Sequence, residues 1–403
     1  VIPFNRSSIC KGVISRAHTI LEGNSSFAGG GRLNRIMRQI SRKITDHLPF
    51  FVTSATAGLE LALMTLATAD SGKREVVIPS FTFSSCANAV LRAGLIPVFA
   101  DIGLNGCIDY EKIREKIGKN TLAIMVVEYC GIDAVDDEFF YWLKKSNIYT
   151  IVDSAQSVGS LHWLRQEKWQ LSDFVVFSFH DTKNLSCGEG GCLLVNPSLP
   201  SDFLNNACII FEKGTDRRKF ENGLVDKYTW QAVGGSFVIS EINLAFLLAQ
   251  ITSVKEITSQ KLFVANQLAK VCKLIDHDLK ARWHSAFGGN GHFFWLVFRD
   301  KNQKNRIMQR LELCGIQATT HYTALHTAPH LAYQTQPGEF TNTDFFAEKK
   351  SVKSKSIRLP YVLSKKNLFP IRSNTNFFGL ESYDNFFIIV SCLDLFFFMK
   401  KKL

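Results

Sequence analysis

Residues with reactive side chains follow short apolar runs along the first half of this chain. Lys183 comes after the apolar run Asp173–Phe179 and precedes the glycine-rich turn Cys187–Gly191, and Asp153 ends another such run, Tyr149–Asp153. A lysine in a partly desolvated site has a lowered pKa and can act as a Schiff-base nucleophile. A carboxylate at a strand end can hold a ring nitrogen protonated. Alone, the lysine is better explained as a surface charge and the aspartate equally well as a helix cap, so only the whole series is informative.

A helix start that is rich in small hydroxyl residues, Thr53–Leu63, precedes these two residues. Its free N–H groups and the positive end of its dipole suit a phosphate group, although an ordinary Ser/Thr N-cap is the commoner meaning of such a segment. The segment Pro79–Ser85 adds an aromatic ring, and Val152–Ser157 contains the acid. In this order, a phosphate cradle, an aromatic ring, an Asp-x-Ala-x-Ser acid and a lysine match the requirements of pyridoxal phosphate.

Other common site motifs are missing from the sequence. It contains no P-loop, no G-x-G-x-x-G after a strand, no HExxH and no nucleophile elbow. None of the ten cysteines forms a CxxC pair or a Cys/His cluster with zinc spacing, so we expect no metal site. The glycine run Gly29–Gly31 follows no strand and is expected to be a flexible loop.

Strands and helices alternate through the region that must position the reactive residues. Apolar runs predict strands at Glu75–Pro79, Pro97–Asp101, Leu122–Glu128, Tyr149–Asp153, Asp173–Phe179 and Cys192–Val195. Helical patterns lie at Ala57–Ala67, Ser84–Leu91, Tyr110–Ile117 and Asp136–Lys145. This alternation predicts an α/β fold with a mostly parallel, doubly wound sheet, in which ligands bind at the carboxyl ends of the strands.

The pattern changes after about residue 240. A long helical stretch, Ser240–Lys270, is followed by the apolar run His292–Asp300, the helical Lys304–Leu313 and the segment Ile316–Tyr322. This order predicts a smaller α+β domain beside the sheet. We therefore expect a large domain at 1–245, a small C-terminal domain at 246–365 and a divergent tail at 366–403.

The net charge is concentrated at one end of the chain. The 403 residues are 46% hydrophobic and 21% charged, which is typical of a globular protein, but the formal net charge is +11. Residues 349–403 hold eleven basic and three acidic residues together with eight phenylalanines. Because a nucleic-acid footprint should spread over a folded face, we expect no nucleic-acid partner for the main body. The apolar stretches of the tail are too short to span a bilayer, so we expect no membrane insertion either.

The N-terminus and the cysteines favour one compartment. Residues 1–6 lead into polar sequence without the pattern of a signal peptide. The scattered cysteines read most simply as free thiols in a reducing environment. We therefore expect a cytoplasmic protein.

Five motifs give the chain a resemblance to a known family. They are PSFTF, CGEGG (Cys187–Gly191), EKGTDR (Glu212–Arg217), VDKYTW (Val225–Trp230) and HY-x-x-LH (His321–His326). With these motifs the chain resembles the DegT/DnrJ/EryC1/StrS sugar aminotransferases from Ile2 to about Ser364. The resemblance implies the pyridoxal-phosphate-dependent transferase fold of type I. It implies transfer of the amino group of glutamate to the 4-keto carbon of dTDP-4-dehydro-6-deoxyglucose, for a cell-surface polysaccharide such as enterobacterial common antigen or lipopolysaccharide.

The resemblance also assigns roles to individual residues. Lys183 would be the catalytic lysine, Asp153 would hold the pyridine nitrogen protonated, and Gln156 would bind the ring's phenolic oxygen. Phe83 would stack on the ring. The cofactor's phosphate would be bound by Ala55, Thr56 and Ser178, and by Ser236 of the segment Gly234–Glu241, which in the family reaches the site of a dimer partner. The sugar nucleotide would meet His321, Tyr322 and His326.

Departures from the family pattern leave alternatives open. Ser236 stands where many relatives have Asn, Phe211 replaces an expected Arg, and Ala324 replaces a usual Pro. Related enzymes that dehydrate the sugar carry His at the lysine position, so Lys183 favours transamination. Transfer to a 3-keto carbon, dehydration, and a degenerate homologue without activity remain as alternatives.

Overall fold

The computed structural model describes most of the chain up to residue 359. The described residues are 4, 9–23, 26–68, 72–103, 106–160, 169–279, 282–283, 289–298, 301–331, 336, 338–347 and 356–359. The predicted tail at 366–403 lies outside them.

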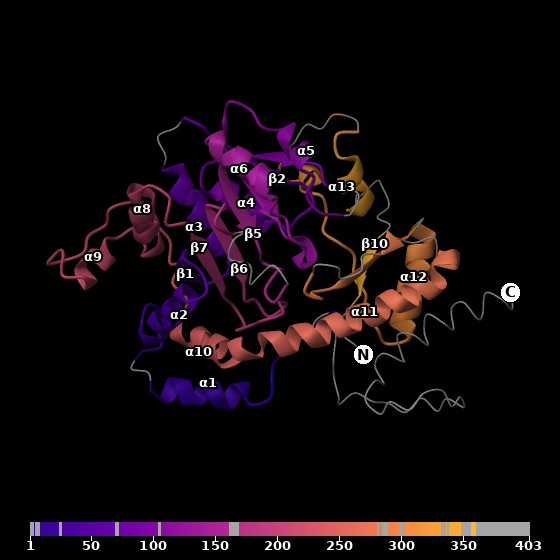
Figure 1. Ribbon diagram of the computed structural model, residues 1–403, viewed down its shortest axis with the longest axis horizontal. Coiled ribbons are helices and arrows are strands. Elements are labelled where there is room, and N and C mark those ends of the chain that lie inside the picture. Colours follow the sequence, from indigo (N-terminus) through magenta and orange to yellow (C-terminus); the bar gives the residue numbers. More distant parts are fainter. Residues whose placement is uncertain are drawn as a thin grey trace.

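A seven-stranded sheet forms the centre of the part of the chain up to Gln250, which we call the large domain (Figure 1). Its strands are β1 (Leu48–Val52), β2 (Glu75–Pro79), β3 (Ile96–Ala100), β4 (Thr121–Val127), β5 (Tyr149–Asp153), β6 (Phe174–Ser178) and β7 (Gly191–Val195), in the spatial order β1-β7-β6-β5-β4-β2-β3. β7 is antiparallel to both of its neighbours, β1 and β6. The pairs β6–β5, β5–β4, β4–β2 and β2–β3 are parallel. The predicted α/β fold with a mostly parallel sheet is confirmed.

Helices cover both faces of this sheet. Successive residues of β5 and β6 alternate between two buried clusters, because side chains of a strand point to opposite faces in turn. One cluster joins the sheet to α1 (Val13–Glu22), α2 (Arg32–Arg42), α5 (Tyr110–Arg114), α6 (Asp137–Lys145) and α10 (Glu241–Gln250). The other joins it to α3 (Ala55–Ala67), α4 (Ser85–Arg92) and α8 (Ser201–Phe211).

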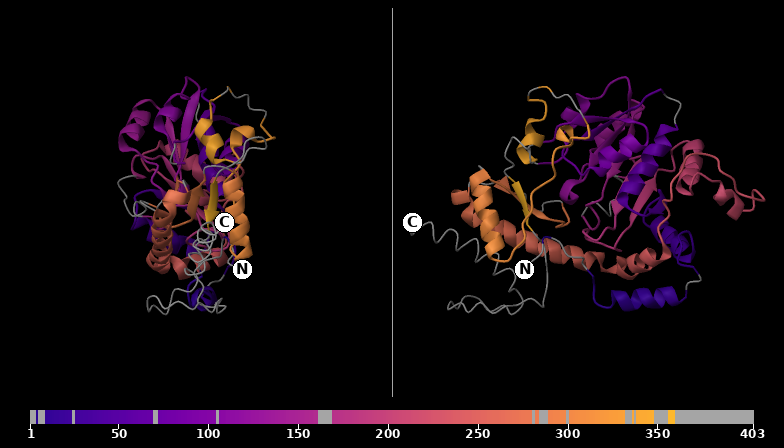
Figure 2. Two further views of the ribbon diagram at one scale, coloured as in Figure 1. Left: turned by 90° about the vertical axis from the view of Figure 1, so that its right-hand side faces the viewer. Right: turned by 180° about the vertical axis from the view of Figure 1, so that it is seen from behind.

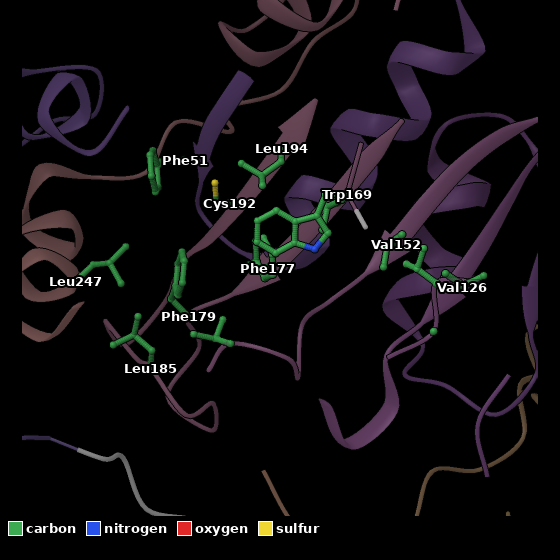
Figure 3. Close-up of a cluster of buried hydrophobic side chains, with 14 of the residues drawn as sticks. Phe51, Val126, Val152, Trp169, Phe177, Phe179, Leu185, Cys192, Leu194 and Leu247 are labelled. Carbon is green, nitrogen blue, oxygen red and sulfur yellow. The ribbon is translucent and has the colours of Figure 1, made fainter. Parts of the chain in front are cut away.

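The first of these clusters is rich in aromatic side chains (Figure 3). The ring of Trp169 lies 5.4 Å from that of Phe177, centroid to centroid, in a T-shaped pair. Burying such rings on both faces explains why the strands are continuous apolar runs rather than alternating ones.

A long helix, α11 (Val254–Leu279), runs from the large domain to the C-terminal elements (Figures 1 and 2). There a second sheet of three strands has the order β10-β9-β8, with β8 at Arg282–Trp283, β9 at Phe294–Val297 and β10 at Ser356–Leu359. The helices α12 (Lys301–Leu313) and α13 (Thr341–Phe346) complete the described part. No helix among the described residues is both long and apolar enough to cross a bilayer.

Gly29 and Gly31 of the glycine run are closely packed against other segments, unlike the flexible loop that the sequence suggested, whereas Gly30 between them is open. Gly31 is the N-cap of α2, and a Cβ built on it would lie 2.9 Å from the carboxyl carbon of Glu241. That carboxylate, fully buried at the start of α10, accepts hydrogen bonds from the backbone N–H groups of Gly31, Leu33 and Asn34. The glycines therefore let a distant acid cap the helix.

Candidate active site

A pocket of about 400 Å³ opens at the carboxyl ends of the central strands. Eight of the eleven predicted site residues line it: Ala55, Thr56, Phe83, Asp153, Gln156, Ser178, Lys183 and Tyr322. They come from segments that follow β1, β2, β5 and β6 and from the C-terminal part of the chain. The parallel strands thus bring to one edge residues that are far apart in sequence.

Asp153 is the last residue of β5 and is almost fully buried, with 5% of its surface exposed. Its Oδ1 accepts a hydrogen bond from the backbone N–H of Ala155 (3.0 Å), and its Oδ2 accepts one from the thiol of Cys86 (3.2 Å). Burial raises the pKa of Asp153, although these two donors and the charge of Lys183 oppose the rise. The carboxylate is thus fixed in direction but incompletely neutralised, which suits a cationic ring nitrogen.

The start of α3 presents backbone donors to the pocket. Ser54 is the N-cap, and its side chain accepts from the N–H of Ala57 at 3.1 Å. Ala55 and Thr56 lie in the first turn, before any intrahelical acceptor, and both line the pocket. Gly191 permits this approach, because a Cβ on it would lie 2.7 Å from the backbone nitrogen of Ala55. Together with the buried hydroxyl of Ser178, these donors form a cradle for a phosphate.

Lys183 lies in the loop between β6 and β7, half-buried in the pocket. The loop is held at its base, where the N–H of Phe179 donates to the carbonyl of Gly190 (2.8 Å). Side chains of α10 hold its far part. The amide of Asn243 donates to the carbonyls of Cys187 (2.9 Å) and Glu189 (2.8 Å), and Gln250 donates to that of Ser186.

Gln156 and two aromatic rings form a third side of the pocket. The Oε1 of Gln156 accepts from the N–H of Cys130 at 2.7 Å, so its Nε2 points as a donor toward the pocket and lies 3.5 Å from the hydroxyl of Tyr322. Phe83 is 53% exposed, which is unusual for a phenylalanine, and its ring is 5.6 Å from that of Tyr322. An exposed aromatic face inside a pocket is free to stack on a flat ligand.

Three predicted site residues do not line the pocket. His321 and His326 are buried, with 5% and 4% of their surfaces exposed. His321 shares a hydrogen bond with the hydroxyl of Tyr129, and His326 shares one with Ser80 (2.7 Å) and stacks on Phe340 at 4.0 Å. Both rings are thus held inside the protein by neighbours of the same chain. Ser236 is exposed and forms a β-bridge with Glu212.

The structure adds residues that the sequence did not single out. Cys86 reaches Asp153 from α4, and Lys261 of α11 and His292 line the pocket. Cys86 comes seven residues after the end of β2, so its position in the sequence could have identified it as a site residue. Lys261 lies inside a helical pattern without any motif, and only the packing of α11 shows its place.

The pocket therefore combines a lysine, a buried acid, a set of backbone and hydroxyl donors and an exposed aromatic ring. Such a set can bind a flat, phosphorylated heteroaromatic aldehyde and move protons next to it.

Comparisons with known proteins agree with this chemistry. The family model of the DegT/DnrJ/EryC1/StrS aminotransferase family matches residues 9–357. GDP-perosamine synthase from Vibrio cholerae is 26% identical over 299 residues, which are 70% of this chain and 75% of that protein.

Solved structures show the same fold. PseC of Helicobacter pylori, an aminotransferase involved in the biosynthesis of pseudoaminic acid, has a TM-score of 0.75 at 20% identity and covers 89% of this chain and 93% of that one. A sugar aminotransferase of Streptococcus pneumoniae, Spr1654 in its PMP form, has a TM-score of 0.77 at 20% identity and covers 99% of both chains. The chain belongs to the DegT/DnrJ/EryC1/StrS family of pyridoxal-phosphate-dependent sugar aminotransferases.

Proposed function

We propose that this chain transfers the amino group of glutamate to the 4-keto carbon of dTDP-4-dehydro-6-deoxyglucose, giving dTDP-4-amino-4,6-dideoxygalactose and 2-oxoglutarate. The observation that carries the proposal is that Lys183, Asp153, Gln156 and the start of α3 line one pocket. The exchange balances, because the donor's C–NH₂ becomes C=O while the sugar's C=O becomes C–NH₂.

The described residues fit the cofactor at each of its polar groups. Ala55, Thr56 and Ser178 would hold the phosphate, Asp153 the ring nitrogen and Gln156 the phenolic oxygen, while Phe83 would cover one ring face. When bound, pyridoxal phosphate supplies an electron sink and carries the amino group between the two substrates.

Lys183 would hold the cofactor before reaction and would move the proton during it. Its amine can take the proton from the α-carbon of glutamate and later deliver one to the sugar carbon that receives nitrogen. The anchored loop between β6 and β7 keeps this amine at the pocket in both halves of the reaction. A histidine at this place has no primary amine to attach the cofactor covalently, so Lys183 favours transamination over dehydration.

The proposal also specifies the nucleotide that carries the sugar and the sugar carbon that receives the amino group. The name of the Vibrio cholerae relative contains a GDP-linked amino sugar, so both GDP- and dTDP-linked keto sugars have to be compared. The alternatives are transfer to a 3-keto carbon, dehydration of the sugar, and a homologue without activity.

The deciding experiment has two steps. Purified protein with added pyridoxal phosphate should show the visible absorption band of enzyme-bound cofactor, and Lys183→Ala should lose it, while Lys213→Ala, a lysine outside the pocket, should keep it. Glutamate with each 3- and 4-keto sugar nucleotide should then give one amino sugar, identified by NMR. A band that survives in Lys183→Ala contradicts the cofactor assignment, and an unchanged sugar shows that the chain is not this transaminase.

A homodimer is part of the same proposal. Residues 212–235, which we name the α9 arm after its helix α9 (Arg217–Glu221), extend from the large domain (Figure 1). The arm exposes Phe220, Leu224, Tyr228, Trp230 and Val233, each between 44% and 76%. Such a concentration of exposed apolar side chains is typical of an interaction surface, and Ser236, which the family resemblance places at a partner's site, follows the arm directly.

A further inference from the structure

A second lysine, Lys261 of α11, lines the active-site pocket and is almost completely buried. Only 5% of its surface is exposed, and no hydrogen bond or ion pair joins it to another residue of the described part of the chain. Burial lowers the pKa of its ammonium group to about 8. Without a counter-ion, such a charge destabilises the protein, so its retention calls for a ligand that compensates it.

The acids that line the same pocket already have partners. Asp153 accepts hydrogen bonds from Cys86 and Ala155, and Glu189 lies 3.5 Å from the ring of His180. Neither acid interacts with Lys261, whose pKa is lowered by burial alone. The ammonium group is therefore left to interact with something that enters the pocket.

The helix carrying Lys261 enters from the β5 side of the site. Gly159, which follows β5, packs against Thr258 and Val254, and Gly291 lies against the backbone of Lys261, where a Cβ would be 2.8 Å from its carbonyl carbon. Next to Gly291, the amide of Asn290 donates to the carbonyl of Gln156 at 2.7 Å.

The phosphate cradle lies at the other side. Ala55 and Thr56 of the cradle follow β1, which three strand steps separate from β5, roughly 14 Å at the usual spacing, and Ser178 of the cradle ends β6, which lies between them. Lys261 therefore belongs to the part of the pocket beyond Gln156, where a substrate rather than the cofactor's phosphate would place its charge.

We propose that Lys261 binds an anionic oxygen group of a substrate, either a carboxylate of the amino donor or the diphosphate of the nucleotide sugar. This inference rests on the proposed function, because it assumes that both substrates use this pocket. The same position also explains why the lysine does not need an acid of its own chain.

Two substitutions of Lys261 and one control separate the sources. Lys261→Met removes the charge at similar length, Lys261→Arg keeps it, and Lys255→Met removes an exposed lysine from the same helix. The dissociation constant of glutamate is measured from the change in the cofactor's absorbance, and that of dTDP by calorimetry. Lys261→Met should weaken one of the two by about 10- to 100-fold, as expected for a hydrogen bond between charged groups, and Lys261→Arg should restore most of it.

The ligand that weakens identifies the source of the anion. Lys255→Met should leave both constants within about twofold, and Lys261→Met should keep the cofactor's affinity and a thermal midpoint at least as high as that of wild type, because it removes a desolvated charge. Equal binding of both ligands by wild type and Lys261→Met overturns the inference, even when the cofactor band and turnover confirm the proposed function. A lower midpoint in Lys261→Met would instead assign the lysine a structural role.

Proton uptake gives a second measurement that does not need turnover. The pocket also contains Asp153, Lys183, His180, Glu189, His292 and Tyr322, so the uptake of wild type is compared with that of Lys261→Arg, which changes only one titrating group. At pH 8.5, calorimetry in two buffers should show proton uptake when wild type binds the anion and less uptake in Lys261→Arg. If no cofactor band forms in wild type, the proposed function fails. The binding of dTDP and of inorganic phosphate to the same variants then decides the role of Lys261. Weaker binding by Lys261→Met supports that role, and equal binding by Lys261→Met and wild type contradicts it.

Discussion

The thiol of Cys86 donates a hydrogen bond to Oδ2 of Asp153 across 3.2 Å, and both residues are buried, with Asp153 lining the pocket. Burial and the neighbouring carboxylate raise the pKa of Cys86 well above its ordinary value, so the thiol stays protonated and acts as a donor. It fixes the direction of the carboxylate that we assign to the cofactor's ring nitrogen. Cys86 is thus a positioning residue.

Replacing this thiol should therefore weaken the cofactor's binding more than it weakens the fold. Cys86→Ala removes one of the donors to Asp153, and we expect about a 5- to 10-fold loss of affinity for pyridoxal phosphate, with a shift in the pH profile of its absorbance. Cys86→Ser should recover most of the affinity. Cys192→Ala, a buried cysteine of β7, is the matched control and should reduce stability without changing the profile. Equal profiles in all three variants would show that Cys86 only fills space.

Asp153→Asn should stabilise the cofactor-free chain at neutral pH. Because burial raises the pKa of Asp153 above its ordinary value of 3.8, ionising it costs stability once the pH exceeds that value. The neutral amide lacks this cost, so its thermal midpoint at pH 7 should exceed that of wild type by about 2 °C or more, and the difference should shrink as the pH falls toward 4. The variant should also bind the cofactor more weakly. Asp226→Asn, on the exposed α9 arm, should change neither property. If wild type has the higher thermal midpoint at pH 7, the raised pKa of Asp153 is contradicted.

Removing the carboxylate of Glu241 should lower the free energy of unfolding of the large domain. It accepts three backbone N–H groups at the start of α2, so Glu241→Ala leaves buried donors without an acceptor. We expect a loss of about 3 kcal/mol in the free energy of unfolding, and about half of that in Glu241→Gln, which keeps one oxygen. Urea denaturation measures both, with the exposed Glu256→Ala as the control. Similar urea midpoints for Glu241→Ala and Glu256→Ala would show that the cap does not stabilise the protein.

Charging the α9 arm should separate the proposed dimer. Trp230 is 76% exposed, and Trp230→Asp places a charge in the centre of an apolar surface. Light scattering should give the mass of two chains for wild type and of one chain for the variant at micromolar concentration. Leu313→Asp, at an equally exposed residue of α12 (79%), should remain dimeric. A monomeric wild type would contradict the proposal for the arm.

Much of the large domain could be predicted from the sequence because its signals are local. The strand ending at Asp153 and the strand before Lys183 are buried on both faces, so they are apolar runs with polar ends. Their parallel pairing then places both residues at one edge. The strand β1 was missed, since Pro49 and the short Leu48–Val52 resemble a connection until their pairing with β7 is seen.

The remaining parts of the site depend on packing between distant segments. Lys261 is one of many lysines in helical patterns, and its burial follows only from the contact of α11 with Gly159 and Gly291. His321 and His326 carry a family motif, but Tyr129, Ser80 and Phe340 hold them away from the pocket lining. The role of Gly29–Gly31 depends on Glu241, about two hundred residues later. None of these partners can be identified from local pattern.

The attachment of the Lys183 loop to α10 has a consequence for how the enzyme is made. Asn243 and Gln250 hold the carbonyls of Ser186, Cys187 and Glu189, yet they are synthesised about sixty residues after the lysine. A nascent chain that has exposed only its first two hundred residues can form the central strands but cannot fix this loop. If Lys183 holds the cofactor as proposed, we expect its capture to wait until α10 has left the ribosome and docked, so that the site would be one of the last features of the large domain to mature.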